Sequence, residues 1–207
     1  MKDTTSDFFD KVYALEDDAE TQALYRDWAE SYDADLTNGG YASPARCAEA
    51  LAEFAQDRTV PVLDIGCGTG LSGEALRAAG FTAVDGTDVC PEMQKKAAQK
   101  GIYRALLPTG PNVLPDVAPG AYAHAVAVGV FSPGHAEATL IDAVIGMLPS
   151  GGLFVFTLND HALADPAYIG RVREMADAGG AELLLRERGP HIPSLDLQST
   201  VFALRKR

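Results

Sequence analysis

Hydrophobic and polar positions follow two different patterns along the chain, and the change between them lies near residue 58. Before it, apolar residues recur at spacings of three and four, which is typical of one face of an α-helix. After it, short apolar runs alternate with amphipathic stretches, the pattern of strand–helix–strand units around a mostly parallel sheet. We therefore expect a single domain over residues 1–207, with an N-terminal helical cap at 1–57 and a Rossmann-like α/β core at 58–207.

The cap is expected to hold three helices. The first is a short helix marked by Phe8, Phe9, Val12 and Leu15. The second runs from about residue 18 to 32 and is marked by Leu24, Tyr25, Trp28, Ala29 and Tyr32. A loop is expected at Asn38-Gly39-Gly40. Pro44 then favours the start of a third helix, which continues to Phe54.

The core pattern predicts a seven-stranded sheet with helices on both faces. Strands are expected at residues 60–65, 82–87, 102–106, 123–128, 153–158, 181–186 and 200–204. Helices are expected at about 71–80, 91–101, 136–148 and 168–178. A short loop over 189–195, with no helix, joins the last two strands, so we expect the last strand to be antiparallel.

A glycine-rich turn follows the first predicted strand and leads into a helix. Its glycines are Gly66, Gly68 and Gly70. Glycine permits positive φ and a close approach of the backbone, so a ligand can lie against the turn at the positive end of the helix. Asp88 follows the second predicted strand and lies 20 residues after Gly68, the separation at which a carboxylate can accept hydrogen bonds from both hydroxyls of a ribose. Asp85 is also acidic, but its place inside the strand favours a structural role.

Two residues beside the turn bear on which nucleotide it would hold. A dinucleotide site needs a glycine at position 71, where this chain has Leu71. Asp64, just before the turn, would place negative charge near the ligand, which suits a cationic group and disfavours pyrophosphate. The alternative for Asp64 is a carboxylate that satisfies amides of the turn. Together these residues favour an adenosyl cofactor without pyrophosphate.

The strand, the turn and Asp88 resemble the first two motifs of the class I S-adenosylmethionine-dependent methyltransferases. The resemblance includes Val89, Pro91, Glu92 and Met93, and the turn at 148–152, and it spans about residues 60–204. The segments at 28–33 and 129–135, with Gly40, Tyr41 and Pro44, resemble the Williams-Beuren syndrome region methyltransferase-like subgroup. The resemblance implies a transferase that binds S-adenosyl-L-methionine.

The resemblance also implies the cofactor contacts. They are Trp28, Tyr32, Asp64, Gly66, Cys67, Gly68, Gly70, Asp88, Val89, Met93, Leu106, Gly129 and Val130. Tyr32 would lie over the cofactor as a lid, and Cys67 would contribute its backbone amide. Because no acidic residue follows the third strand, we expect backbone groups near Leu106 to read the adenine.

Charge and cysteine content limit the acceptor and the compartment. The formal net charge is -12, which repels phosphate backbones and anionic lipids, so we expect a small-molecule acceptor and neither a nucleic acid nor a membrane as partner. The start of the chain lacks the pattern of a signal peptide, and Cys47, Cys67 and Cys90 have no metal-binding spacing. We therefore expect a cytoplasmic protein without a metal, whose oligomeric state cannot be read from the sequence.

Methyl transfer from a sulfonium is an in-line displacement that alignment and desolvation can accelerate, so a catalytic base is optional. Of the loop histidines, His135 is the best placed to serve as one. Two other functions remain open. One is a non-catalytic regulatory protein that binds S-adenosylmethionine. The other is an NAD-dependent oxidoreductase, which Leu71 and the antiparallel strand disfavour.

Overall fold

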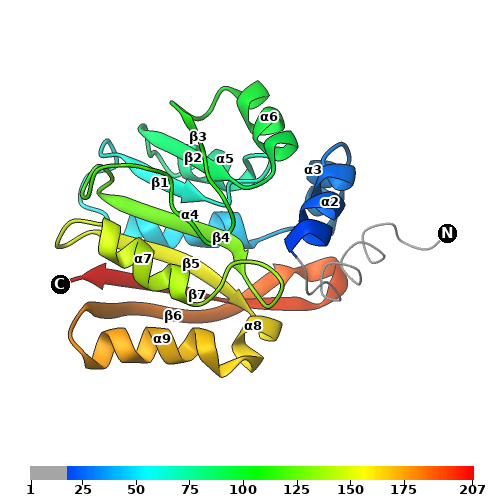
Figure 1. Ribbon diagram of the computed structural model, residues 1–207. Helices are drawn as coiled ribbons and strands as arrows, with labels where there is room; N and C mark the ends of the chain where they lie inside the picture. Colours follow the sequence, from blue (N-terminus) through cyan, green and yellow to red (C-terminus); the bar gives the residue numbers. More distant parts are fainter. Residues whose placement is uncertain (1–17) are drawn as a thin grey trace.

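A computed structural model describes residues 18–207 as one seven-stranded sheet covered by helices (Figure 1). The strand order is β3-β2-β1-β4-β5-β7-β6. The strands are β1 (Val62–Ile65), β2 (Val84–Asp88), β3 (Leu106–Pro108), β4 (His124–Phe131), β5 (Leu153–Asn159), β6 (Ala181–Ile192) and β7 (Leu197–Lys206). Only β7 runs antiparallel to its neighbours, β5 and β6; the other adjacent pairs are parallel. The predicted Rossmann-like sheet with an antiparallel last strand is confirmed.

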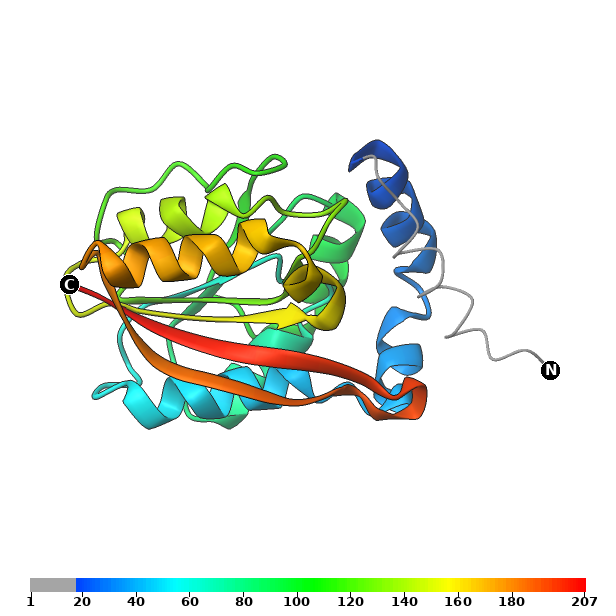
Figure 2. The ribbon, with the colours of Figure 1, turned by 90° about the horizontal axis from the view of Figure 1, so that it is seen from below.

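Helices cover both faces and one end of the sheet (Figure 2). One face carries α4 (Ser43–Phe54) and α5 (Leu71–Ala78), and the other carries α7 (Thr139–Met147) and α9 (Pro166–Asp177). The helices α6 (Pro91–Lys100) and α8 (Asp160–Ala164) directly follow β2 and β5. The remaining two, α2 (Asp18–Trp28) and α3 (Tyr32–Gly39), stand at the end of the sheet where the parallel strands finish.

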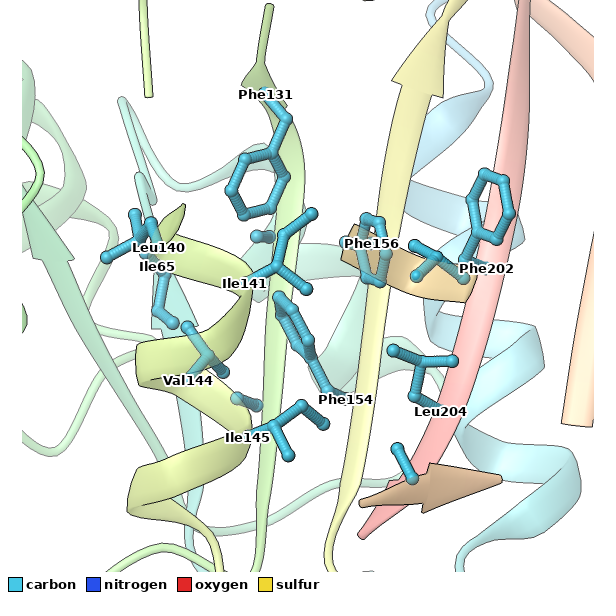
Figure 3. Close-up of a cluster of buried hydrophobic side chains, with 14 of the residues drawn as sticks. Ile65, Phe131, Leu140, Ile141, Val144, Ile145, Phe154, Phe156, Phe202 and Leu204 are labelled. Atoms are coloured by element: carbon cyan, nitrogen blue, oxygen red, sulfur yellow. The ribbon is translucent and has the colours of Figure 1, made fainter. Parts of the chain in front are cut away.

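The central strands are buried on both faces because their side chains alternate between two helical layers. Phe154 and Phe156 of β5 face α7, where Ile141 and Val144 pack against them (Figure 3). Val155, between the two phenylalanines, points to the opposite layer and belongs to the cluster under α4 and α5. This double burial fixes the strands and therefore the positions of their carboxyl ends.

Several helix boundaries follow from the residues that mark them in the sequence. Pro91 occupies the first turn of α6, and Gly101 ends that helix with φ of 63°. Asp165 caps α9 by accepting the amide hydrogen of Ala167 at 2.8 Å. The predicted helices at 71–80, 91–101, 136–148 and 168–178 are confirmed with shifts of up to three residues at their ends.

The cap differs from its prediction. The helix expected over residues 18–32 is two helices, since α2 ends at Trp28 and α3 begins at Tyr32. The apolar spacing continues through the bend because the rings of Trp28 and Tyr32 still meet, with centroids 4.7 Å apart. The loop expected at residues 38–40 is the end of α3, which Gly40 closes with φ of 76°. The third predicted helix is α4, and it forms a layer on the sheet. The short helix predicted over residues 8–15 lies outside the described residues.

The third strand was also predicted in the wrong place, at 102–106 instead of Leu106–Pro108. The residues before it turn their side chains to polar partners. Tyr103 donates a hydrogen bond to Asp64, and Arg104 binds Asp85. Two strands are longer than predicted. The strand β4 continues to Phe131 through an irregularity after Ala127, and β6 continues to Ile192. Because β3 ends at Pro108, the segment that follows it at the end of the sheet is residues 109–113.

Candidate functional site

A crevice of about 980 Å³, counting its open mouth, lies at the carboxyl ends of β1, β2 and β4. Its floor comes from Ile65, Gly66 and Gly68, from Thr87 and Asp88, and from Val128, Gly129 and Val130. Tyr25 and Tyr32 of the cap line it from α2 and α3, and the loop 109–113 lines one side. Ligand sites in open α/β sheets lie at this place, beyond the carboxyl ends of the strands.

The glycine turn needs its glycines for two different reasons. Gly66, Gly68 and Gly70 all have positive φ, of 64°, 54° and 100°. A Cβ on Gly66 would lie 2.5 Å from Cγ2 of Val130, so the turn is packed against β4 at that point. A Cβ on Gly68 would meet nothing within 4 Å, because this glycine faces the open crevice. The backbone at Gly68 is therefore the part of the turn that a ligand can approach closely.

Asp88 lies at the end of β2, beside the turn. Its two oxygens accept the amide hydrogens of Gly68 and Cys90, each at 2.8 Å. Burial raises the pKa of Asp88, and the backbone hydrogen bonds act against that rise. Each carboxylate oxygen can accept a second hydrogen bond, so a ligand with two neighbouring hydroxyls can bind here without displacing the turn.

Asp85, the alternative acid on β2, points away from the crevice into an ion pair. Arg104 donates to both of its oxygens, at 3.0 and 2.7 Å, and the hydroxyl of Tyr122 donates at 2.9 Å. Burial acts to raise the pKa of Asp85, but these hydrogen bonds hold it below the usual value. Asp85 is therefore structural, as its position within the strand indicated.

Asp64 lies beneath the turn, fully buried, and does not line the crevice. Its Oδ2 accepts from the hydroxyls of Ser72 and Tyr103, at 2.6 and 2.7 Å, while Oδ1 has no hydrogen-bond partner among residues 18–207. Burial raises the pKa of Asp64 to about 7, and the two hydroxyl donors oppose the rise. Its partners are thus side chains and not turn amides, and its negative charge is only partial near pH 7.

Trp28 and Tyr32 share a cluster at the cap but have different places in it. Tyr32 lines the crevice, whereas Trp28 is buried behind it and donates its indole hydrogen to Asp35 at 2.8 Å. The Trp28 ring meets the Tyr32 ring edge to face. Trp28 therefore holds Tyr32 over the crevice and does not face the space that a cofactor would fill.

An ion-pair cluster that no sequence pattern predicts joins the cap to the glycine turn. Asp33, next to Tyr32, accepts a hydrogen bond from the hydroxyl of Thr69 within the turn. Nζ of Lys100 lies 2.7 Å from Oδ2 of Asp33 and 2.8 Å from Oε2 of Glu74. One lysine at the end of α6 thus bridges α3 and α5 across the side of the crevice.

The other predicted site residues divide into two groups. Val89, Met93, Gly129, Val130 and His135 line the crevice. Cys67, Gly70 and Leu106 do not line it.

The amide of Cys67 is used within the fold, since it donates to the carbonyl of Thr87 at 3.0 Å. Cys67 lines a smaller recess beside the crevice, and burial raises the pKa of its thiol, which leaves no reactive thiolate. Gly70 is the N-cap of α5, and Leu106 of β3 pairs with Gly86 of β2. Because β3 starts later than predicted, the backbone that reaches the crevice there is residues 109–113 and not the backbone near Leu106.

Sequence reasoning missed Tyr25 and the loop 109–113 as lining residues. Tyr25 was placed on the correct helical face, but the spacing could not show that this face borders a crevice. The glycine and prolines around the loop indicated only an irregular segment. Within residues 18–207, the structure holds no group of three or more His, Cys, Asp or Glu side chains arranged to bind a metal, and no helix long and apolar enough to cross a membrane.

Comparison with known proteins gives one family and one fold. Residues 40–205 match the model of a methyltransferase domain. The human Methyltransferase-like protein 27 is 30% identical over 155 residues, which are 73% of this chain and 62% of that protein. The chain therefore spans less than two thirds of that relative.

Two solved structures are similar in fold. Magnesium protoporphyrin IX methyltransferase from Synechocystis PCC 6803, with bound SAH, has a TM-score of 0.61 at 14% identity, over 83% of this chain and 85% of that chain. The [4+2]-cyclase SpnF has a TM-score of 0.58 at 18% identity, over 78% of this chain and 80% of that chain. These two neighbours carry names of different reactions, so the shared fold does not decide the chemistry.

Proposed function

Because the chain belongs to the methyltransferase domain family, whose cofactor is S-adenosylmethionine, we propose that it transfers the methyl group of this cofactor to a small-molecule acceptor. The class I resemblance read from residues 60–204 is confirmed by that family match. The observation that carries the proposal is the pairing of Gly68, whose α-carbon faces open space, with Asp88 in one crevice.

The residues present fit an adenosyl group in that crevice. Asp88 would hold the ribose hydroxyls, and the backbone at Gly66 and Gly68 would lie against the amino acid part of the cofactor. Val89 and Met93 offer apolar surface for the adenine on one side, and the loop 109–113 offers it on the other. Leu71 occupies the position at which a dinucleotide site needs a glycine, which supports the adenosyl cofactor over NAD.

When bound, the cofactor supplies an electrophilic methyl group on a positively charged sulfur. The reaction is then an in-line displacement, and the protein's contribution is alignment and exclusion of water. Tyr25 and Tyr32 cover the crevice from the cap, and Asp88 is the only ionisable carboxylate in its lining among the described residues. This arrangement supports a buried reaction site with negative charge near the cationic cofactor.

Two features support a small acceptor. The cap lines the crevice through Tyr25 and Tyr32 and is held by the Lys100 bridge to Asp33, which limits the size of what can enter. The net charge of -12 disfavours nucleic acid as a substrate. The cysteines at 47, 67 and 90 are buried and unbridged, which fits the reducing conditions of a cytoplasmic enzyme.

The test is incubation of the protein with S-adenosylmethionine labelled in the methyl group and an extract of small metabolites, followed by separation of labelled products. We expect a labelled small molecule and an equal amount of S-adenosylhomocysteine. Tight binding of the cofactor by calorimetry, with no labelled product, would instead favour a non-catalytic regulatory protein. NADH emission that is stronger in the presence of the protein than at the same NADH concentration without it would favour the oxidoreductase.

A further inference from the structure

One wall of the crevice, formed by α2 and the segment after β4, contains a chain of three polar side chains. Oγ of Ser132 lies 2.9 Å from Nδ1 of His135, and Nε2 of His135 lies 3.1 Å from the hydroxyl oxygen of Tyr25. The rings of Tyr25 and His135 meet edge to face, with centroids 5.8 Å apart. Tyr25 and His135 both line the crevice, so the chain runs from the buried Ser132 to its interior.

On the basis of the proposed function, we propose that the acceptor is an uncharged, largely apolar molecule that presents a hydroxyl group, and that its proton passes through Tyr25 to His135. A base at His135 would not by itself specify the acceptor. The residues that line the crevice and the order of the three polar side chains specify its charge and its reacting group.

The charge of the described lining disfavours an anionic acceptor. No lysine or arginine is among the residues of the described chain that line the crevice, and Asp88 is there. A carboxylate or phosphate on the acceptor would lose its hydration without gaining a cation, beside a like charge. An uncharged molecule avoids both the loss of ionic hydration and the repulsion by Asp88.

The surface near His135 is mainly apolar. Pro111, Val113, Ala136 and Leu140 line this part of the crevice. Asn112, from the same loop, turns its Oδ1 to the amide of Glu137 at 2.7 Å, which ties the loop 109–113 to the segment that carries His135. The acceptor therefore meets apolar groups on most sides and finds its polar contact at Tyr25 and His135.

The neighbours of His135 favour one tautomer. The carbonyl oxygen of Pro133 lies 3.5 Å from Nδ1 and can only accept, which favours a proton on Nδ1 shared with Ser132 Oγ. Nε2 then presents its lone pair to the hydroxyl of Tyr25, which donates to it. A phenolic hydroxyl can accept a hydrogen bond while it donates its own, so an acceptor hydroxyl can donate to Tyr25 in the same arrangement.

The proton and electron balance of the step is simple. The acceptor oxygen forms a bond to the methyl carbon as the bond between that carbon and sulfur breaks, and the electron pair of the broken bond stays on sulfur. The hydroxyl proton moves to Tyr25 while the Tyr25 proton moves to Nε2 of His135. The products are the methyl ether, S-adenosylhomocysteine and a protonated histidine, which returns its proton to water.

A hydroxyl acceptor benefits most from such a chain. A thiol ionises with a pKa near 8.5, so roughly a few per cent is already the strongly nucleophilic thiolate at pH 7, whereas phenols ionise near 10 and alcohols much higher, so their reactive anions are far scarcer. General base catalysis contributes typically about a hundredfold to ten-thousandfold to such a step. The presence of the chain in the crevice therefore points to oxygen.

The experiment divides the metabolite extract by anion exchange into a neutral and an anionic fraction and incubates each with protein and S-adenosylmethionine carrying a carbon-13 methyl group. We expect the labelled product in the neutral fraction, with the carbon shift of a methyl group bound to oxygen. A product from the anionic fraction alone, or a methyl group on nitrogen or sulfur, would overturn this inference and leave methyl transfer intact. Cofactor binding without any product would overturn both.

With that product in hand, His135→Gln should lower kcat by about a hundredfold or more and leave the affinity for S-adenosylmethionine unchanged. The wild-type kcat should rise with pH through a single ionisation that the variant lacks, and Tyr25→Phe should also lower kcat. His161→Gln is the matched control, because this histidine lies on the exposed side of α8 and outside the crevice. A His135→Gln enzyme with wild-type kcat and pH profile would overturn the proton path.

Discussion

The carboxylate of Asp88 accepts the amide hydrogen of Gly68 at 2.8 Å, so the end of β2 is tied directly to the glycine turn that follows β1. The contact joins residues 20 apart in the sequence and fixes the two edges of the crevice relative to each other. The second carboxylate oxygen of Asp88 accepts the amide hydrogen of Cys90 at the start of α6. One side chain thus organises the turn, the strand and the following helix around the proposed ribose position.

Asp88→Asn tests that position. The amide keeps the shape of the side chain but loses its charge and one accepting oxygen. Because a hydrogen bond to a charged group contributes roughly 1.5–3 kcal/mol, we expect the Kd for S-adenosylmethionine to rise about tenfold to a hundredfold. Isothermal titration calorimetry measures it directly.

Asp85→Asn is the matched control, since it changes an acid on the same strand that does not line the crevice. It weakens the contacts with Arg104 and Tyr122, so Tm should fall while the Kd stays at the wild-type value. Equal cofactor affinity in the two variants would argue against Asp88 as the ribose contact.

Two glycines with similar positive φ separate cofactor binding from backbone strain. Gly68 and Gly101 have φ of 54° and 63°, and a Cβ on either would meet nothing within 4 Å. Alanine at either position should lower the free energy of unfolding by about 1 kcal/mol, because the left-handed conformation is unfavourable for a side chain.

Only Gly68→Ala places a methyl group in the crevice, so only this variant should lose affinity for S-adenosylmethionine, by at least about tenfold, or 1.4 kcal/mol. Urea unfolding and calorimetry on both variants give the two quantities. An equal effect of both substitutions on the Kd would show that the turn acts through stability alone.

The parts of the site that could be predicted are those encoded over short distances. The glycine turn and Asp88 follow consecutive strands, and parallel strands bring their carboxyl ends to one edge of the sheet. The fold class could be predicted for the same reason, because each strand and helix has its own apolar pattern.

The rest depends on contacts between distant residues. Tyr103 reaches Asp64 across 39 positions, and this contact removes residues 102–105 from the predicted third strand. That shift moves the chain by several residues and puts 109–113, instead of Leu106, at the crevice. The break between α2 and α3 likewise follows from packing around Trp28, which a spacing of three and four residues cannot reveal.

Asp64 gives the protein a specific dependence of stability on pH. Its pKa is about 7 in the folded protein because of burial, whereas an aspartate in an unfolded chain titrates near 3.9. Between roughly pH 4 and pH 7 the folded state therefore retains a proton that the unfolded state has lost, and the free energy of unfolding falls as the pH rises. Above about pH 7 this contribution is constant.

Asp64→Asn removes the ionisation. The difference in unfolding free energy between variant and wild type should shift in favour of the variant by on the order of a few kcal/mol as the pH rises from 4 to 7. Urea unfolding at a series of pH values measures it. Tyr103→Phe removes a hydrogen bond that lowers the Asp64 pKa, so it should extend the window to higher pH. A difference that does not vary with pH would contradict the raised pKa.

Lys100→Met tests how the cap is held. The lysine bridges Asp33 of α3 and Glu74 of α5 with its side chain 19% exposed, so its removal should loosen α3 while the hydrogen bond from Thr69 to Asp33 remains. At roughly 1 kcal/mol for a partly exposed pair, we expect S-adenosylmethionine to dissociate about fivefold faster, and amides of α3 to exchange faster. Stopped-flow dissociation and hydrogen exchange measure the two effects.

Added salt should speed dissociation from the wild type more than from the variant, since it screens the bridge. Lys95→Met, an exposed position on the same helix, should leave both rates unchanged, and identical rates in the two variants would mean that the bridge does not hold the cap closed.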